Sequence, residues 1–354
     1  MNFASDNTAP VPAEVLAMLG RANQGAAAAY GADALMEQVT ARIRDLFEAP
    51  KAAVYLVATG TAANALSIAT FCPPWGAVFC HRDAHVEADE CGAPEFFTGG
   101  AKLKLVDGDH ARMSPAALAA AIAATGNVGV HNVQKGMLSL TNATEAGAVY
   151  TPAQVAGLAA VARAHDLPCH MDGARFANAL VAAGCTPAEM TWKAGIDILS
   201  FGGTKNGLLG VEAVVLFDPA RWPGKAWEFE LRRKRGGHLF SKHRYLSAQM
   251  LAYLEDGLWL RLARQANAAA ARLAAGLAHV EGARLVHPAE ANMVFAAFPR
   301  AAHRRARDAG YAYYLWPFDQ SLEGAEDEAL SARLVCSWNT ADADVDSLLS
   351  VLRG

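Results

Sequence analysis

The sequence predicts an α/β protein with a mostly parallel sheet in a large domain, followed by a small α+β domain. Three observations lead to this prediction. Short apolar runs alternate with helix-prone segments between residues 51 and 217, which is typical of parallel strands joined by crossover helices. The long alanine- and leucine-rich stretch Leu246–Ala278 then indicates a helical connector. At 354 residues, the chain is also long enough for two domains.

The amino-terminal region lies outside this alternation. Residues 1–12 are polar and contain proline, which predicts an extended arm rather than an element that folds alone. Pro12–Gly20 and Asp33–Phe47 have helical spacing, and the small-residue loop Gly25–Gly31 between them carries Tyr30.

The large domain is predicted over residues 13–250, with a seven-stranded sheet. The expected strands are Val54–Val57, Ala77–Cys80, Lys102–Val106, Val128–Val133, Leu167–Met171, Ile196–Ser200 and Val211–Phe217. The expected helices between them are Ala62–Ala69, Glu87–Phe97, Ser114–Ala124, Pro152–His165 and Arg175–Ala182.

The small domain is predicted over residues 251–354, joined by the arm 1–12. Its expected strands are Ala291–Phe298 and Ala332–Ser337, and its expected helices are Arg300–Ala309 and Asp342–Leu352. Gly257 interrupts the helical connector, which we therefore expect in two pieces.

Composition excludes several classes of protein. A net charge of −4 lacks the excess of positive charge that is typical of proteins that bind nucleic acid. The six cysteines include no C-x-x-C pair, which argues against a zinc site or a disulfide framework, and we expect no metal. The start of the chain lacks the pattern of a signal peptide, and no apolar segment reaches membrane-spanning length. We therefore expect a soluble cytoplasmic protein.

Two strand ends carry the residues of greatest chemical interest. Asp172 follows Leu167–Met171, and Lys205 follows Ile196–Ser200 and two glycines. Ligands bind at the carboxyl ends of strands in open α/β sheets. An aspartate and a lysine there suit a pyridoxal ring, since the amine forms an imine with the aldehyde and the carboxylate keeps the pyridine nitrogen protonated. The simpler alternatives are a helix-capping Asp172 and a surface Lys205.

Thr59-Gly60-Thr61 follows a strand and opens a helix. Small residues there let the backbone approach a phosphate, to which Thr61 and the free N–H groups of the helix donate. Many such turns bind nothing. The segment has neither nucleotide-binding glycine pattern, so a nucleotide loop is not the preferred interpretation.

These features belong to an ordered set of motifs. The set comprises Ser5-Asp6, Tyr30-Gly31, Thr59-Gly60-Thr61-Ala62-Ala63-Asn64, His85, Leu138-Ser139-Leu140-Thr141-Asn142, Asp172-Gly173-Ala174-Arg175, Thr204-Lys205, Asn292-Met293 and Arg333-Leu334-Val335. In this order the chain resembles the low-specificity L-threonine aldolases, within the aminotransferase-like fold type I of pyridoxal-phosphate enzymes. The resemblance extends over nearly the whole chain.

The resemblance implies pyridoxal 5'-phosphate as the cofactor, bound as a Schiff base to Lys205. Asp172 would then pair with the ring nitrogen, and His85 would stack over the ring. Further cofactor contacts implied by the family are Thr59, Gly60, Thr61, Arg175, Thr204 and Lys242. The basic run 232–235 before Lys242 is otherwise a solvated helix face.

The resemblance also implies how an amino acid would bind. Arg175, Arg333 and Ser5 would hold its carboxylate, and Tyr30 would contribute to the substrate pocket. His85 and His131 are the candidates to orient or deprotonate its β-hydroxyl. A lone histidine in an apolar strand, as His131 is here, is otherwise a core residue.

The implied reaction is reversible cleavage of threonine, allo-threonine or a related substrate such as phenylserine into glycine and an aldehyde. Other pyridoxal-phosphate activities, β-elimination or transamination, are the alternative, and a non-catalytic binding protein is a more distant one. Many relatives carry an apolar aromatic residue where this chain has Asp89 beside Glu90, so the resemblance does not fix the polarity of the aldehyde pocket. The family implies a homodimer that completes each site, and commonly a homotetramer.

Overall fold

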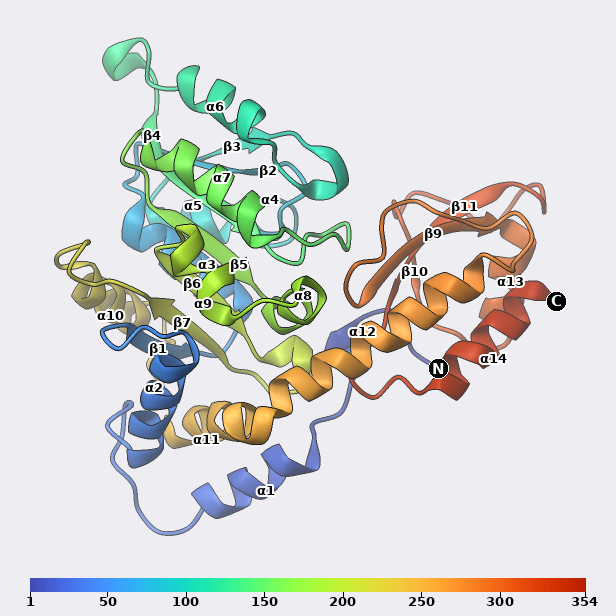
Figure 1. Ribbon diagram of the computed structural model, residues 1–354, viewed down its shortest axis with the longest axis horizontal. Helices are drawn as coiled ribbons and strands as arrows, with labels where there is room; N and C mark the ends of the chain where they lie inside the picture. Colours follow the sequence, from blue (N-terminus) through green and yellow to red (C-terminus); the bar gives the residue numbers. More distant parts are fainter.

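In the computed structural model, which describes residues 1–354, two lobes are joined by the long helix α12 (Leu258–Leu277), as Figure 1 shows. The larger lobe contains a seven-stranded sheet, and the smaller lobe contains a four-stranded sheet. Both termini lie at the small lobe (Figure 1).

The large sheet has the strand order β1-β7-β6-β5-β4-β2-β3. Its strands are β1 (Ala53–Val57), β2 (Gly76–His81), β3 (Lys102–Val106), β4 (Gln134–Thr141), β5 (Cys169–Gly173), β6 (Ile198–Gly202) and β7 (Glu212–Leu216). The four pairs from β3 to β6 are parallel, whereas β7 is antiparallel to both of its neighbours. The predicted seven-stranded, mostly parallel sheet is confirmed.

One of the seven predicted strands was wrong. Residues 128–133 form a loop with a short 3-10 turn, Gly129–His131, and the strand is β4, which begins at Gln134. Val128 and Val130 suggested a strand, but Val130 is 95% exposed. The run 134–141 becomes the strand because it pairs with both β2 and β5 and buries Met137 and Leu138 completely.

Helices cover both faces of the large sheet. The helices of the large lobe are α1 (Ala13–Ala22), α2 (Ala34–Leu46), α3 (Gly60–Phe71), α4 (His85–Ala88), α5 (Ala93–Thr98), α6 (Pro115–Ala123), α7 (Pro152–Arg163), α8 (Phe176–Ala183), α9 (Pro187–Met190), α10 (Lys225–Arg235) and α11 (Arg244–Leu254). Apolar residues of α1, α2, α6, α7, α8 and α11 form one core cluster, whereas those of α3 and α10 form another. The strands contribute to both clusters in alternation, as Ile198 and Leu199 of β6 do.

Two predicted helices are divided by residues in the left-handed region. The helix expected at 87–97 is split into α4 and α5, because Cys91 and Gly92 have φ angles of 52° and 72°. The connector expected in two pieces is confirmed as α11 and α12. Asp256 and Gly257, with φ angles of 49° and 66°, separate them.

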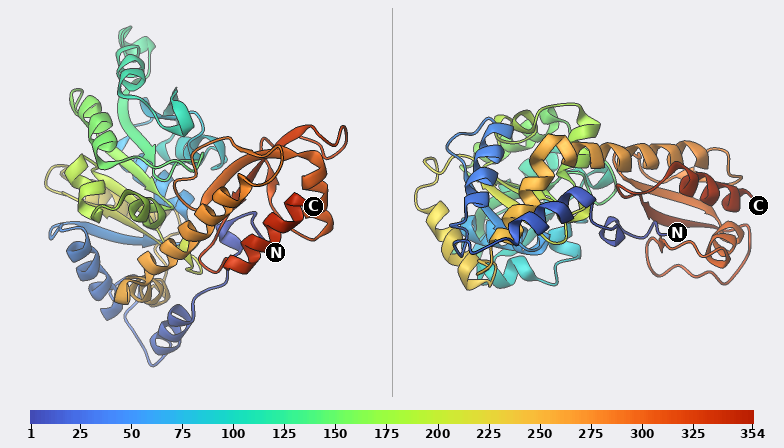
Figure 2. Two further views of the ribbon diagram at one scale, coloured as in Figure 1. Left: turned by 45° about the vertical axis from the view of Figure 1, so that its right-hand side comes forward. Right: turned by 90° about the horizontal axis from the view of Figure 1, so that it is seen from below.

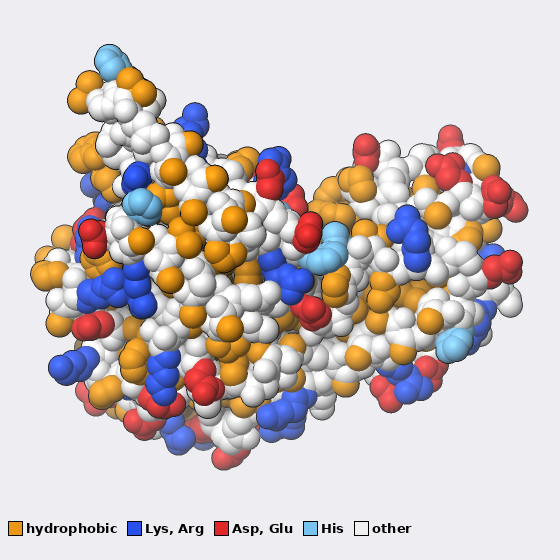
Figure 3. Space-filling model, turned by 45° about the horizontal axis from the view of Figure 1, so that its top comes forward, with side chains coloured by type: hydrophobic (Ala, Val, Ile, Leu, Met, Phe, Trp, Pro, Cys, Tyr) orange, Lys and Arg blue, Asp and Glu red, His pale blue; other side chains and the backbone are white.

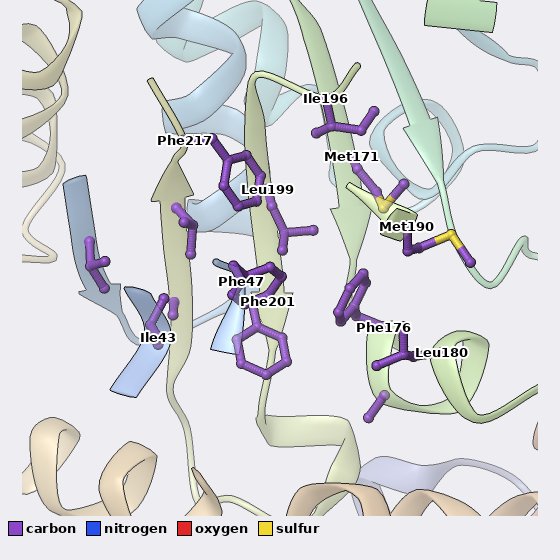
Figure 4. Close-up of a cluster of buried hydrophobic side chains, with 14 of the residues drawn as sticks. Ile43, Phe47, Met171, Phe176, Leu180, Met190, Ile196, Leu199, Phe201 and Phe217 are labelled. Carbon is purple, nitrogen blue, oxygen red and sulfur yellow. The ribbon is translucent and has the colours of Figure 1, made fainter. Parts of the chain in front are cut away.

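The core beneath the strand that leads to Lys205 combines aromatic rings with aliphatic and methionine side chains (Figure 4). Phe201 of β6 is completely buried, and its ring packs edge-on against Phe47, Phe176 and Trp259 at centroid distances of 5.5 to 5.7 Å. Aromatic pairs in this arrangement add to the free energy gained by burial alone. The strand end is therefore anchored rigidly from below.

We expect Phe201→Ala to lower the free energy of unfolding by about 3–5 kcal/mol, because it removes a fully buried ring and leaves a cavity. The shift of the urea midpoint measures this loss. The matched control is Phe96→Ala, since Phe96 is 79% exposed and its loss is expected to change stability by less than about 0.5 kcal/mol. Equal effects of the two substitutions would contradict the prediction.

The small lobe has its own core. Its sheet, in the order β10-β11-β9-β8, is antiparallel and is covered by α12, α13 (Arg300–Asp308) and α14 (Asp342–Arg353). The strands are β8 (Arg284–Leu285), β9 (Met293–Pro299), β10 (Tyr314–Leu315) and β11 (Ala329–Val335). The division of the chain into 13–250 and 251–354 stays a prediction, since α12 contributes residues to both cores.

The amino-terminal arm runs from α1 on the large lobe to the small lobe, as both views in Figure 2 show. Phe3 is buried in the small-lobe core, where its N–H donates to the carbonyl of Ala312 and its carbonyl accepts from Val335. The arm therefore passes between the lobes. None of the helices combines the length and apolar character needed to span a bilayer.

Candidate active site

Strands β5 and β6 end side by side at the carboxyl edge of the large sheet. They are parallel, with Asp172 opposite Ser200 in the register. Asp172 is the penultimate residue of β5, and Lys205 lies in the 3-10 turn Thr204–Asn206 just after β6. The two residues on which the sequence prediction depends therefore lie at the same edge, and Lys205 is only partly buried.

The glycines before Lys205 are required by lack of space. A Cβ atom on Gly202 would lie 2.3 Å from the carbonyl oxygen of Ala174, and one on Gly203 would lie 2.6 Å from that of Val211. Any larger residue would push the neighbouring backbone away. These glycines let the chain turn tightly from β6 toward the sheet edge.

A buried glutamate fixes the turn that carries Lys205. The Glu212 carboxylate accepts a hydrogen bond of 2.6 Å from the N–H of Gly203, and the hydroxyl of Thr204 accepts one of 3.2 Å from the N–H of Val211. Burial raises the pKa of Glu212 to about 7, although hydrogen bonds from Thr204 and from the N–H of Gly203 oppose the rise. Thr204 is thus held beside Lys205, and its role toward a cofactor stays a prediction.

Asp172 is buried and held by two donors. Its Oδ1 accepts from the N–H of Ala174 at 2.9 Å, and its Oδ2 accepts from Nδ2 of Asn64 at 2.9 Å. The N-cap residue of α8 is Arg175, so Asp172 does not cap this helix. A carboxylate fixed in this way is suited to face a cationic N–H of a ligand.

His85 opens α4 and meets a buried carboxylate. Its Nδ1 lies 2.9 Å from Oε1 of Glu90, which also accepts from Asn64 at 2.9 Å. Burial opposes the charged form of His85, but the Glu90 hydrogen bond raises its pKa above the ordinary value. For Glu90, burial and the nearby Asp172 raise the pKa, although His85 and Asn64 oppose this. His85, Asn64, Glu90 and Asp172 form one connected network.

The turn before α3 has the features of an anion site. Thr59 is the N-cap residue, and its hydroxyl accepts from the N–H of Ala62 at 3.1 Å. The amides of Gly60 and Thr61 precede the first intrahelical hydrogen bonds, and the space beside Gly60 is open. Free amides at a helix N-terminus bind phosphate well. The phosphate contact itself stays a prediction.

Arg175 is engaged by the amino-terminal arm. Its Nε and Nη2 donate to the two oxygens of Asp6 at 2.7 and 3.0 Å, and Nδ2 of Asn292 donates to the same carboxylate at 3.1 Å. Both charges are buried. Burial opposes a charged guanidinium, but Asp6 raises the pKa of Arg175, and Arg175 in turn lowers the pKa of Asp6 despite its burial. Arg175 thus ties the arm to the large lobe.

Arg333 reaches this region from β11 of the small sheet. Its guanidinium lies over the rings of Tyr314 and Trp316 at 5.3 and 5.0 Å, and its Nη2 donates to the carbonyl of Ala4 at 3.4 Å. Its Nε is buried without a hydrogen-bond partner. Burial and the nearby Arg175 lower its pKa. An orphaned, buried N–H on a cation is suited to an anionic ligand group.

Ser5 precedes Asp6 in the arm, so it lies next to the Asp6–Arg175 pair. Its hydroxyl accepts from the N–H of Asn7 at 3.2 Å as the N-cap of a 3-10 turn, and it is partly exposed. The predicted contact of Ser5 with a substrate carboxylate stays a prediction.

Three predicted site residues are not brought to this edge within one copy of the chain. His131 lies before β4 begins, at the opposite edge of the parallel sheet from Asp172, and is exposed. Tyr30 is 51% exposed, with the amine of Lys234 lying 4.7 Å from its ring centroid. Lys242 is also exposed. His131 is far from the carboxyl edge because the strand predicted at 128–133 forms instead at 134–141, so the residue at the carboxyl end of β4 is Thr141.

Other residues of the site had no role assigned from the sequence. Asp6, Asn64 and Asn292 belong to the matched motifs, but the motifs alone do not indicate a role for them. Glu145 lies outside the motifs, although its charge raises the pKa of His85 and Arg175 in addition to the larger effects of Glu90 and Asp6. The Ser5-Asp6 motif was the only sequence signal for Asp6. It did not indicate Arg175 as the partner of Asp6, because Arg175 is 169 residues away.

The site lies between the lobes. Figure 3 shows a notch between the two lobes, at which acidic, basic and histidine side chains gather. A separate surface cavity of about 610 Å³, lined by residues such as Trp192 and Ile196, lies at the amino ends of the strands. It contains no residue of the candidate site. Parallel sheets usually bind ligands at the carboxyl edge instead.

Comparison with known proteins agrees with this geometry. A profile of the beta-eliminating lyase family matches residues 2–299. The chain belongs to this family. It is 40% identical over 351 residues to a low specificity L-threonine aldolase of a Pseudomonas species, covering 99% of this chain and 96% of that protein. The enzyme of the same name from Pseudomonas aeruginosa is 40% identical over 338 residues, covering 96% and 93%.

Solved structures with the same fold include that of a threonine aldolase. The threonine aldolase of Leishmania major superposes with a TM-score of 0.89 at 26% identity, covering 99% of this chain and 98% of that one. A protein of Exiguobacterium described as a putative aromatic amino acid beta-eliminating lyase/threonine aldolase gives a TM-score of 0.70 at 18% identity, covering 96% and 93%. The second likeness concerns the fold alone. The family and fold predicted from the ordered motifs are confirmed.

Proposed function

We propose that this protein is a pyridoxal-phosphate-dependent L-threonine aldolase. It would be a carbon–carbon lyase that reversibly cleaves L-threonine, L-allo-threonine and related β-hydroxy-α-amino acids to glycine and an aldehyde. The observation that carries the proposal is that Asp172 and Lys205 lie at the same edge of the sheet, in a chain that is 40% identical throughout to enzymes of this name.

The residues of the site fit pyridoxal phosphate. Lys205 offers an amine for the aldehyde, and the buried carboxylate of Asp172 suits a protonated ring nitrogen. The open amides before α3 suit the phosphate, and His85 offers a flat ring. When bound, the cofactor withdraws electrons from the bonds at Cα of the amino acid.

The chain's own residues would select which bond breaks. Arg333 has a free N–H for the substrate carboxylate, and Arg175 adds positive charge beside it. Holding the carboxylate fixes the rotation about the N–Cα bond of the amino acid. The Cα–Cβ bond would then be the one perpendicular to the cofactor ring and aligned for cleavage. His85 would accept the proton of the β-hydroxyl as that bond breaks. Specificity for aldol cleavage is thus a matter of orientation.

The test is product analysis with L-threonine, L-allo-threonine and L-phenylserine. We expect glycine and the matching aldehyde in equal amounts, and the relative rates give the preferred side chain and stereochemistry. Ammonia with a keto acid would instead indicate β-elimination, and transfer of the amino group to an added keto acid would indicate a transaminase. A colourless protein that turns over none of these substrates would contradict the proposal and favour a binding role.

We expect Arg333→Leu to raise KM for L-threonine by about 10- to 100-fold, because a charged hydrogen bond to the carboxylate is lost. The absorbance of the bound cofactor should stay unchanged. Steady-state kinetics of glycine formation measure the effect. Arg42→Leu is the matched control, since Arg42 is an exposed arginine of α2 whose side chain makes no hydrogen bond. An unchanged KM in Arg333→Leu would contradict this role.

We also propose that the enzyme is a cytoplasmic homodimer at least, and a homotetramer when fully assembled. Tyr30 lies beside the exposed Trp227 and Leu231 of α10, an apolar face that a second copy would cover. Tyr30 and Lys242, which are exposed in one copy, would then be available to the partner's site. Light scattering on the purified enzyme tests this, and a fully active monomer would contradict it.

A further inference from the structure

Glu90 is a fully enclosed carboxylate beside His85. It lies in the turn between α4 and α5, and its side chain is 0% exposed, whereas the adjacent Asp89 faces solvent. The turn is made by Cys91 and Gly92, whose left-handed backbone reverses the chain. Asp89, which stands where many relatives carry an apolar aromatic residue, is thus exposed, and its neighbour Glu90 is buried.

The partners of Glu90 are few and specific. Its Oε1 meets Nδ1 of His85 and Nδ2 of Asn64, each at 2.9 Å, and its Oε2 is buried without a partner. The same Asn64 amide donates to Oδ2 of Asp172 at 2.9 Å. The Asn64 side chain therefore holds two carboxylates. A ring nitrogen of His85 and one carboxylate oxygen each of Glu90 and Asp172 lie within 4.8 Å of one another.

Such an arrangement is costly unless it serves a purpose. A buried carboxylate with an unpartnered oxygen loses hydration that one amide does not restore. A second carboxylate nearby increases that cost, which a proton on His85 offsets. A purely structural position would be filled more favourably by an apolar side chain. The network therefore points to control of the proton on His85.

We propose that Glu90 is a positioning residue that keeps a proton on Nδ1 of His85 and so leaves Nε2 free to accept the proton of the substrate β-hydroxyl. The proposal rests on the proposed aldolase function. A carboxylate accepts a hydrogen bond from the N–H of Nδ1, which fixes the tautomer that carries its proton there. The same carboxylate stabilises the imidazolium formed when Nε2 is protonated.

The electrons and protons of this step balance. The hydroxyl proton passes to Nε2 of His85, and the O–H electron pair becomes the second bond of the aldehyde carbonyl. The pair of the Cα–Cβ bond stays on Cα, where a proton later completes glycine. In the reverse direction His85 returns its proton to the new alkoxide oxygen. Glu90 exchanges no atom with the substrate and acts only through the ring.

The first test is the pH profile of Glu90→Gln in the cofactor-loaded enzyme. Glutamine has nearly the same size, but it removes the negative charge that favours the imidazolium. The pKa of His85 should therefore fall, so the acid limb of kcat/KM moves to lower pH. The plateau of kcat should fall by about 10- to 100-fold because the base is weaker and its tautomer is no longer fixed. KM should change much less than kcat.

The matched control is Glu87→Gln, an exposed glutamate on α4 three residues away. It should leave both the profile and the plateau unchanged. A Glu90→Gln enzyme whose activity falls while the acid limb stays in place would overturn the proposal, since a packing role alone predicts this. Equal shifts in the two variants would overturn it as well.

A second measurement needs no variant of Glu90 and no activity. In the wild-type holoenzyme labelled with 15N-histidine, solid-state NMR should give a signal for a proton on Nδ1 of His85, assigned by its loss in His85→Asn. A neutral His85 with its proton on Nε2 would overturn the proposal. Wild-type enzyme that forms no glycine would refute the aldolase function, while the tautomer would still decide the role of Glu90.

Discussion

Replacing Lys205 with alanine is expected to reduce cleavage of L-threonine by at least about four orders of magnitude. Lys205 is the amine that β6 and the Gly202-Gly203 turn direct to the sheet edge, and no other lysine follows a strand there. Without this amine the cofactor is held only by non-covalent contacts. Glycine formation measures the activity, and visible absorbance measures the state of the bound cofactor.

A covalent assay separates this role from a structural one. Borohydride reduction of wild-type enzyme should leave the mass of the reduced cofactor on the peptide that contains Lys205, and Lys205→Ala should carry no such mass. Lys102→Ala is the matched control, because Lys102 is an exposed lysine of β3 outside the site. A label on another lysine, or full activity of Lys205→Ala, would contradict the assignment.

The position of Asp172 and Lys205 at one edge of the sheet could be predicted from the sequence because it depends on short-range patterns. Apolar runs identified β5 and β6, and parallel strands bring their carboxyl ends together whatever the rest of the chain does. Asp172 and Lys205 follow those runs directly. An error of two residues in a strand boundary does not move either side chain to the other edge.

His131 shows where such reasoning fails. The run 128–133 has the β-branched residues of a strand, but the strand forms from the next run, 134–141. His131 therefore lies in an exposed loop and not in a strand. Only pairing with β2 and β5 distinguishes the two runs. Strand pairing is a property of the whole sheet, and intrinsic preference does not fix it.

The polar network could not be predicted for a related reason. Asp6 and Arg175 are 169 residues apart, and Asn64 is 108 residues from Asp172. No periodicity connects such positions, because their contact depends on how the arm and α3 pack onto the strand ends. The sequence predicted Lys205 and Asp172 as the residues for which we propose a direct chemical role, whereas the residues that hold them became visible only in three dimensions.

Replacing Asp172 with asparagine is expected to lower kcat/KM for L-threonine by at least about three orders of magnitude. The reason is electrostatic, since a neutral amide does not favour a proton on the pyridine nitrogen, and the withdrawal of electrons from Cα depends on that proton. Glycine formation at saturating pyridoxal phosphate measures the loss. Asp45→Asn, at an exposed position of α2, is the control.

The hydrogen bonds of Asp172 make this substitution more than a change of charge. Both carboxylate oxygens accept, from Ala174 and from Asn64, so an amide group at this position must oppose one of the two donors. Asn64 can relieve the conflict by rotating its unpartnered Oδ1 toward the new amide. That rotation takes its Nδ2 away from Glu90, so the tautomer of His85 should become mixed as well. An Asp172→Asn enzyme that keeps the wild-type rate would contradict the role of this carboxylate beneath the ring.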